Sequence, residues 1–285
     1  MNTRILWCAL GLFLGKYALA QKVVDWKIDN LKSIGGITPT LLGNPKVIPI
    51  EGISSVAFNG KVDGLTLEAS PMIGAEEFTV EVIFYPYSGN VSTAPRFVHM
   101  QQDEDNRITV ELRILGTNKW ILDTFIKSSP SERTLLSDTA FRHPTDAWHH
   151  AALVYRAGQM SHFVNGAKEL SGAVTYRPVT GGQSSLGVRL NKTNYFNGAI
   201  RQLRVTHKAL TTDQFLSADP VATTISTGGI NRKGDAGSRW ESVFCDLGFQ
   251  PVPWTKNHFL SNFDVTGKRR TDYGVGIRIM KDTRR

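Results

Sequence analysis

The sequence predicts an all-β fold in which two antiparallel sheets pack face to face over residues 22–218. Three observations favour this fold. Short apolar runs alternate with turn signals, two segments alternate strictly between apolar and polar residues, and one Asn-Gly pair marks a tight hairpin. Helical periodicity is nearly absent from the same region. A chain so rich in strands and turns buries its apolar side chains as a sandwich.

The two alternating segments give each sheet a buried side and a polar side. The first, at 78–84, places on its apolar face Phe78, Val80, Val82 and Phe84. The second, at 107–115, places on its polar face Thr109, Glu111 and Arg113. Such alternation is typical of antiparallel sheets in which one side is buried.

One hairpin and one helical turn follow from local signals. Asn165-Gly166 predicts a tight hairpin, because this pair accepts the positive φ angles of a type I′ turn. Thr211 is followed three residues later by Gln214, which is the spacing of a capping box. We therefore expect a short helical turn there.

Residues 1–20 have the features of a cleaved signal peptide. A basic start at Arg4 precedes an apolar run, and small residues precede the expected cleavage after Ala20. We expect a protein that is secreted, periplasmic or on the cell surface. The apolar run ends at Lys16 and is too short to span a bilayer, so no transmembrane anchor is expected. Cleavage would leave Cys245 as the only cysteine, which excludes an internal disulfide.

The character of the chain changes after the predicted sandwich. Residues 219–238 are rich in Gly, Ser, Thr and charge, and are interpreted as a linker or loop. Residues 239–285 form a C-terminal extension of unknown type, with two short apolar runs at 240–245 and 275–280. Because the extension is small, we expect it to dock on the sandwich.

Three sequence blocks resemble one known family. The run AWHHAALVY at 147–155 and FVNG at 163–166 resemble the core of laminin G-like domains in the concanavalin A-like lectin/glucanase superfamily. The opening of these domains is similar to VAFNG at 56–60 followed by FTVEV at 78–82. Their end is similar to FNGAIRQLRV at 196–205 followed by HKAL at 207–210. The resemblance implies a two-sheet antiparallel jelly roll with a role in carbohydrate or ligand binding.

The sequence gives no catalytic residue. Glycoside hydrolases of this superfamily need paired carboxylates spaced along one strand face, and no such motif occurs. His149 and His150 are interpreted as structural, because adjacent strand residues point to opposite faces and cannot share one ion.

Binding residues are expected among aromatic rings that stack on sugars and polar groups that bond to hydroxyls. The candidates for ligand binding are Tyr85, Tyr87, Glu111, Arg113, Trp120, Tyr176 and Tyr195. Calcium is the one cofactor considered, because acidic loops supply the oxygen ligands it prefers, although a solvated turn is the alternative reading. The candidates for calcium binding are Asn59, Asp63, Asp103 and Asp105.

The formal charge is +8, a modest excess compatible with acidic glycans, and no basic run with interleaved aromatics indicates nucleic acid.

The leading hypothesis is a module that binds a polysaccharide or glycoconjugate without catalysis. One alternative is a glycoside hydrolase or polysaccharide lyase with an atypical site, tested at Glu111 and Asp123. Another is a protein-binding or envelope scaffold that uses residues 228–285. Asn90 and Asn191 lie in glycosylation acceptor patterns, which matter only in a eukaryotic host.

Overall fold

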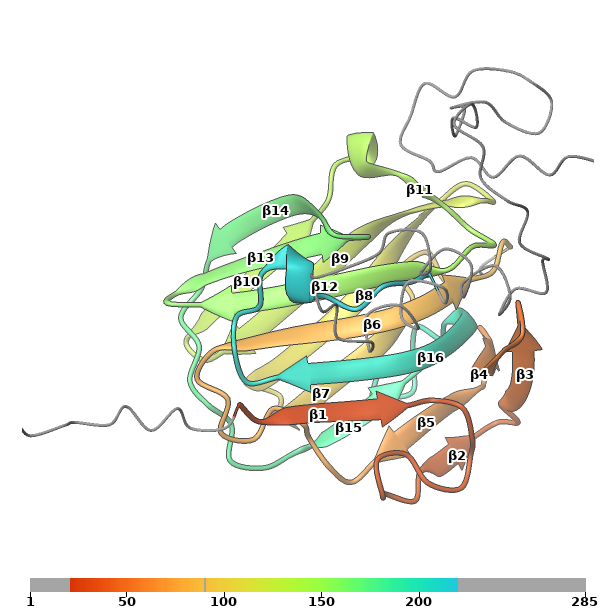
Figure 1. The fold of residues 1–285 in the computed structure, drawn as a ribbon, viewed down its shortest axis with the longest axis horizontal. Coiled ribbons are helices and arrows are strands. Elements are labelled where there is room, and N and C mark those ends of the chain that lie inside the picture. Colours follow the sequence, from red (N-terminus) through yellow and green to blue (C-terminus); the bar gives the residue numbers. More distant parts are fainter. Residues whose placement is uncertain (1–20, 90, 220–285) are drawn as a thin grey trace, which may run out of the picture. The chain divides into compact units, whose positions relative to one another are not determined.

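The computed structural model describes residues 21–89 and 91–219, which form a sandwich of two antiparallel sheets (Figure 1). The first sheet contains β1 (Val23–Lys27), β3 (Lys46–Ile50), β4 (Ile53–Asn59), β6 (Phe78–Pro86), β12 (His149–Arg156), β13 (Gln159–Val164), β14 (Ala167–Ala173) and β16 (Asn197–Thr206). The second contains β2 (Thr40–Leu42), β5 (Gly64–Leu67), β7 (Arg96–Asp103), β8 (Asn106–Leu115), β9 (Lys119–Ser128), β10 (Ser131–Leu136), β11 (His143–Pro144) and β15 (Gln183–Leu186). The predicted two-sheet fold is confirmed.

The strand order shows how distant parts of the sequence meet. The first sheet runs β14-β13-β12-β6-β16-β4-β3, with β1 paired to β16, and the second runs β10-β9-β8-β7-β15-β5-β2, with β11 paired to β9. Most neighbours are therefore joined by crossovers rather than by simple hairpins. In the second sheet, β7 with β8 and β8 with β9 form hairpins, and these three strands lie beneath the site described below.

The core lies between the sheets and contains the predicted apolar faces. Phe84 of β6 is fully buried, and its ring centroid lies 4.5 Å from that of Phe97 and 5.3 Å from that of Trp120. Phe78, Val80 and Val82 are also fully buried. Burial of these side chains between the sheets supplies the main driving force for folding.

The predicted local features are present. Asn165 and Gly166 have φ angles of 48° and 81° and join β13 to β14, as expected for a type I′ hairpin. The predicted helical turn is the 3₁₀ helix η2 (Thr212–Gln214), in which the Gln214 side chain accepts the backbone N–H of Thr211. A second 3₁₀ helix, η1, spans Thr139–Phe141.

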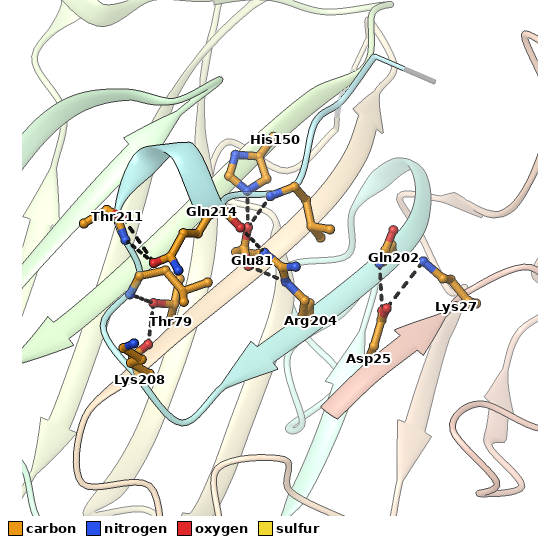
Figure 2. A network of polar contacts seen from close by, with 12 residues as sticks. Asp25, Lys27, Thr79, Glu81, His150, Gln202, Arg204, Lys208, Thr211 and Gln214 are labelled. Carbon is orange, nitrogen blue, oxygen red and sulfur yellow. Dashed lines mark hydrogen bonds and ion pairs between the residues drawn. The ribbon is translucent and has the colours of Figure 1, made fainter. Parts of the chain in front are cut away.

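The chain beyond β16 crosses the outer face of the first sheet, and we call residues 207–219 the strap. Figure 2 shows that the strap is held by Glu81 of β6, whose side chain is fully buried. Glu81 Oε1 accepts the backbone N–H of Leu216 at 2.7 Å and lies 3.1 Å from His150 Nε2. Glu81 Oε2 lies 2.6 Å from Arg204 Nε, and Arg204 Nη2 donates to a strap carbonyl at 2.8 Å.

His149 and His150 face opposite sides of the first sheet, as expected. The His149 ring packs in the core beside Trp120, and its Nε2 bonds to the carbonyl of Pro144 at 2.9 Å. The His150 ring instead faces the strap, where it lies 5.5 Å from the ring of Phe215. Both residues are held by bonds within the fold, which is consistent with a structural role.

Two predicted segments lie outside the described residues: the signal peptide at 1–20 and the C-terminal extension at 239–285 with nearly all of its linker. Within the described part of the chain, there is no helix of the length and apolar character needed to cross a bilayer.

Candidate ligand-binding groove

A groove of about 260 Å³ lies on the outer face of the second sheet, over β7, β8 and β9. Side chains from alternate positions of these strands point into it, because their neighbours in sequence point into the core. The groove is lined by Arg96, Arg107, Thr109, Glu111, Arg113, Asp123, Phe125, Thr134 and Arg189. Four arginines and two carboxylates therefore line one polar depression.

An alternating row of charges crosses the floor of the groove. Glu111 and Asp123 lie directly opposite each other on β8 and β9, and only 3% and 1% of each residue is exposed. Arg96 Nε lies 2.5 Å from Glu111 Oε1, which also accepts the Thr109 hydroxyl at 2.7 Å. Arg113 Nη2 lies 2.5 Å from Asp123 Oδ2 and 3.8 Å from Glu111 Oε2. The arginines thus offset the repulsion expected between facing carboxylates.

The two carboxylates retain oxygens that no described residue satisfies. Glu111 Oε2 and Asp123 Oδ1 are buried and lack a hydrogen-bond partner within residues 21–89 and 91–219. Arg113 and Asp123 Oδ2 form a close ion pair, which leaves Asp123 Oδ1 free of any partner among these residues. Because a buried acceptor without a donor is costly, these oxygens are suited to accept hydroxyl groups from a ligand.

Burial, together with the neighbouring Glu111 carboxylate, raises the pKa of Asp123 to about 6, although Arg113 opposes the increase. Asp123 therefore changes charge close to neutral pH. The net charge of the groove lining is +2 when both carboxylates are ionised, and it increases when Asp123 takes up a proton.

The groove also has an aromatic wall and a cationic end. The Arg107 guanidinium lies 5.2 Å from the ring centroid of Phe125, within the range of a cation–π contact. Arg189 enters the groove from the loop between β15 and β16. Burial and the nearby guanidiniums of Arg96 and Arg107 lower the pKa of Arg189.

The predicted ligand-binding residues are only partly brought together. Glu111 and Arg113 lie side by side in the groove. The expectation that Trp120 and Tyr176 are exposed to ligand is wrong, because they are 0% and 9% exposed. The Trp120 indole donates to a backbone carbonyl at 2.9 Å, and the Tyr176 ring packs in the core.

The other three tyrosines lie elsewhere, and each is half-buried. Tyr85 and Tyr87 are in ring contact near the end of β6, with centroids 5.7 Å apart, and the Tyr85 ring lies 5.4 Å from that of Trp148. Burial raises the pKa of both tyrosines, and Asp146 adds to the increase. Tyr195 lies in the loop before β16 and does not line the groove.

The residues predicted to bind calcium do not form one site. Asp63 lies just before the start of β5, and Asp103 is the last residue of β7. Both strands pair antiparallel with β15 and so run in the same direction, which places the two residues at opposite ends of the sheet. Asn59 Oδ1 accepts three backbone N–H groups of its own turn, and Asp105 pairs with Lys127 at 2.8 Å. No group of three or more metal-ligating side chains occurs among the described residues.

Sequence reasoning missed most of the groove as a ligand site. Arg96, Arg107 and Arg189 were not singled out, and Asp123 was considered only for an atypical enzyme. One signal could have placed Asp123: the three-residue loop at 116–118 fixes the register of the β8–β9 hairpin and brings Asp123 opposite Glu111. Arg189 lies in a loop, where no periodic pattern indicates its direction.

The comparison with solved structures finds similar chains at low sequence identity. Domain 4 of AbnA, a GH43 extracellular arabinanase from Geobacillus stearothermophilus in complex with arabinotriose, is 20% identical, with a TM-score of 0.52 over 68% of this chain and 96% of that domain. The SAP-like pentraxin of Limulus polyphemus is 18% identical, with a TM-score of 0.47 over 64% of this chain and 85% of its own. The binding domain of botulinum neurotoxin serotype D/C is 11% identical, with a TM-score of 0.48 over 67% of this chain and 49% of its own. The present chain thus spans about half of that binding domain.

No curated protein matches the chain in sequence. The family model described as the concanavalin A-like lectin/glucanases superfamily matches residues 59–214, which is more than half of the chain. The strand order and the sequence motifs agree with that match. The chain therefore belongs to the concanavalin A-like lectin/glucanase superfamily, through a laminin G-like domain.

Proposed function

We propose that this protein is a secreted or surface-associated carbohydrate-binding module that holds a polysaccharide or glycoconjugate in the groove and has no catalytic activity of its own. The observation that supports it most is the groove itself, in which buried carboxylate oxygens without partners lie beside guanidiniums on an open sheet face. The arabinanase domain of the same fold, in complex with arabinotriose, supports a carbohydrate as the ligand.

The chemistry of the groove suits a sugar. Glu111 Oε2 and Asp123 Oδ1 would accept hydrogen bonds from hydroxyl groups, while the arginines would donate to ring and hydroxyl oxygens. The half-buried ring of Phe125 offers an apolar surface on the same wall. An excess of two positive charges favours an acidic glycan over a neutral one.

A glycan array of the mature chain tests this proposal. We expect binding to a defined set of glycans that is lost in the double variant Glu111→Gln/Asp123→Asn and retained in Tyr85→Ala, which removes a half-exposed ring outside the groove. Absence of binding to neutral and acidic glycans alike would contradict the proposal. Loss in Tyr85→Ala alone would place the ligand on the tyrosine pair of the first sheet.

Calcium remains a prediction that the same array tests. The runs would be repeated with added calcium and with a chelator. Dependence on calcium, together with its loss in Asp63→Asn or Asp103→Asn, would support a metal site at the corresponding end of the second sheet.

Catalysis is a second candidate because Glu111 and Asp123 form a facing carboxylate pair, and the raised pKa of Asp123 is a property of acid catalysts. Binding is favoured because each carboxylate also forms a close ion pair with an arginine. Release of reducing ends from a polysaccharide panel, abolished by Glu111→Gln or Asp123→Asn, would instead support an atypical hydrolase or lyase.

A scaffold role for residues 228–285 would be supported if their deletion abolished a protein interaction and left glycan binding unchanged.

Export is the remaining part of the proposal. It is supported by the basic, apolar and small-residue regions of 1–20. N-terminal sequencing of protein recovered outside the cytoplasm should begin at Gln21, and a chain that retains Met1 would contradict cleavage.

A further inference from the structure

His99 lies on the groove side of β7 with a hydrogen-bond donor that has no partner. It is paired with Thr109, which lines the groove, and its sequence neighbours Val98 and Met100 are buried in the core. His99 Nδ1 accepts the backbone N–H of Leu190 at 3.2 Å, so the proton of the neutral ring must reside on Nε2. Nε2 is buried and lacks a partner among the described residues.

The His99 ring stays neutral because it is buried and lies near three arginines. Burial, and after it the charges of Arg189, Arg107 and Arg96, lower the pKa of His99 to about 3. A neutral imidazole with its proton on Nε2 and three guanidiniums thus gather at one end of the groove. These four groups present donors, and the buried carboxylate beside them, Glu111, pairs with Arg96 alone, so the remaining donors are suited to an anion.

The guanidiniums of this cluster are unequally compensated. Arg96 is paired with Glu111 at 2.5 Å. Arg107 donates to the backbone carbonyl of Glu104 and lies 3.5 Å from the Glu104 carboxylate, a side chain that is 77% exposed and therefore weakly attractive. Arg189 forms no hydrogen bond or ion pair through its side chain within residues 21–89 and 91–219. One arginine is thus left with its full donor capacity facing the groove.

We propose that this end of the groove is an anion subsite in which Arg189, with Arg107 and His99 Nε2, binds an oxyanion group of an acidic glycan. The inference rests on the proposed function, since it assumes that the glycan lies in the groove. It assigns different roles to two parts of the groove. Glu111 and Asp123 accept hydrogen bonds from hydroxyl groups in the middle, and the arginine cluster at one end favours a negatively charged sugar. The oxyanion is either the carboxylate of a uronic acid or a sulfate ester, because both present oxygens that accept from a guanidinium fork.

Calorimetric titration of the full mature chain with matched oligosaccharides tests the subsite. One pair is an oligogalacturonate and its methyl ester, and the other is a sulfated galactan oligosaccharide and its desulfated form. Within the pair from the correct source, we expect the charged member to bind at least about tenfold more tightly, and this preference to weaken as salt increases. The pair in which the preference is found identifies the source of the anion.

Three variants locate the preference. Arg189→Ala should abolish the preference, so that the charged and neutral members bind with similar affinity. Arg189→Lys should retain part of the preference, because the charge remains but the fork is lost. Arg156→Ala removes one positive charge from the first sheet, where the side chain is 74% exposed, and should leave the preference intact. Circular dichroism and the melting temperature would verify that each variant is folded.

The possible outcomes separate the two proposals. Equal binding of charged and neutral members, or a preference that survives in Arg189→Ala, overturns the subsite and leaves glycan binding standing. Failure of every oligosaccharide and array glycan overturns the proposed function and the subsite with it. Equally tight, Arg189-dependent binding of a polyglutamate peptide would overturn the assignment to a glycan.

Discussion

The buried carboxylate of Glu81 should be one of the strongest single contributors to the stability of the sandwich. Replacing it by Gln keeps the shape and one acceptor oxygen but removes the negative charge beside Arg204. Breaking a buried ion pair by removing one partner costs about 3–5 kcal/mol. The Arg204 side chain is 20% exposed and is able to reach water, so we expect the lower end, about 3 kcal/mol.

Urea denaturation followed by tryptophan fluorescence measures this loss. For a domain of this size we take a slope of about 3 kcal/mol per M, the upper end of the usual range, so Glu81→Gln should lower the midpoint by about 1 M. Glu77→Gln is the matched control, because Glu77 precedes the same strand and its pair with Arg156 is exposed. An exposed pair contributes about 0–1 kcal/mol, a shift of at most about 0.3 M. Should the two variants unfold at the same urea concentration, the network around Glu81 would not stabilise the fold as reasoned.

Three further predictions follow from the core, the groove and one turn. Phe84→Ala should lower the free energy of unfolding by about 3–5 kcal/mol, since the ring is fully buried between the sheets, and a loss below 1 kcal/mol in urea denaturation would contradict this role. The folded pKa of Asp123, about 6, is above the unfolded value of about 3.9, so wild type should lose about 2 kcal/mol of stability relative to Asp123→Asn as pH rises from 4 to 7. A difference between the two proteins that stays constant with pH would refute this. Gly187→Ala should lower the melting temperature by several degrees, because φ is +75° and the added Cβ would lie 2.4 Å from the Phe58 ring. Gly52 has a similar φ but open space around it, so Gly52→Ala should lower the melting temperature less.

The fold could be predicted from the sequence because it depends on patterns that are local. Alternation in 107–115 assigns the faces of β8, and Asn165-Gly166 has the backbone angles its chemistry favours. The same reasoning applied to 119–128 would have placed Trp120 on the core side with Leu122. Its selection as a ligand residue came from its aromatic character alone.

The remaining features depend on contacts between distant segments. Glu81 occupies the polar side of an alternating strand and would be expected in water, but the strap covers that side and buries it completely. Arg189 lines the groove only because its loop lies beside β7, some 90 residues earlier in the chain. No short-range pattern encodes either contact, since both arise from the order of strands in the sandwich.

The strap and the groove lie on opposite outer faces, one on each sheet. Arg201 bonds to the carbonyls of Ser217 and Ala218 at 3.1 and 2.9 Å, so the strap is held down almost to its last described residue, Asp219. A domain shortened to end there and coupled to a solid support through that terminus would point its arginine-lined depression toward the solution. Oriented capture of this kind would let polymers much longer than the domain reach it without steric hindrance from the support.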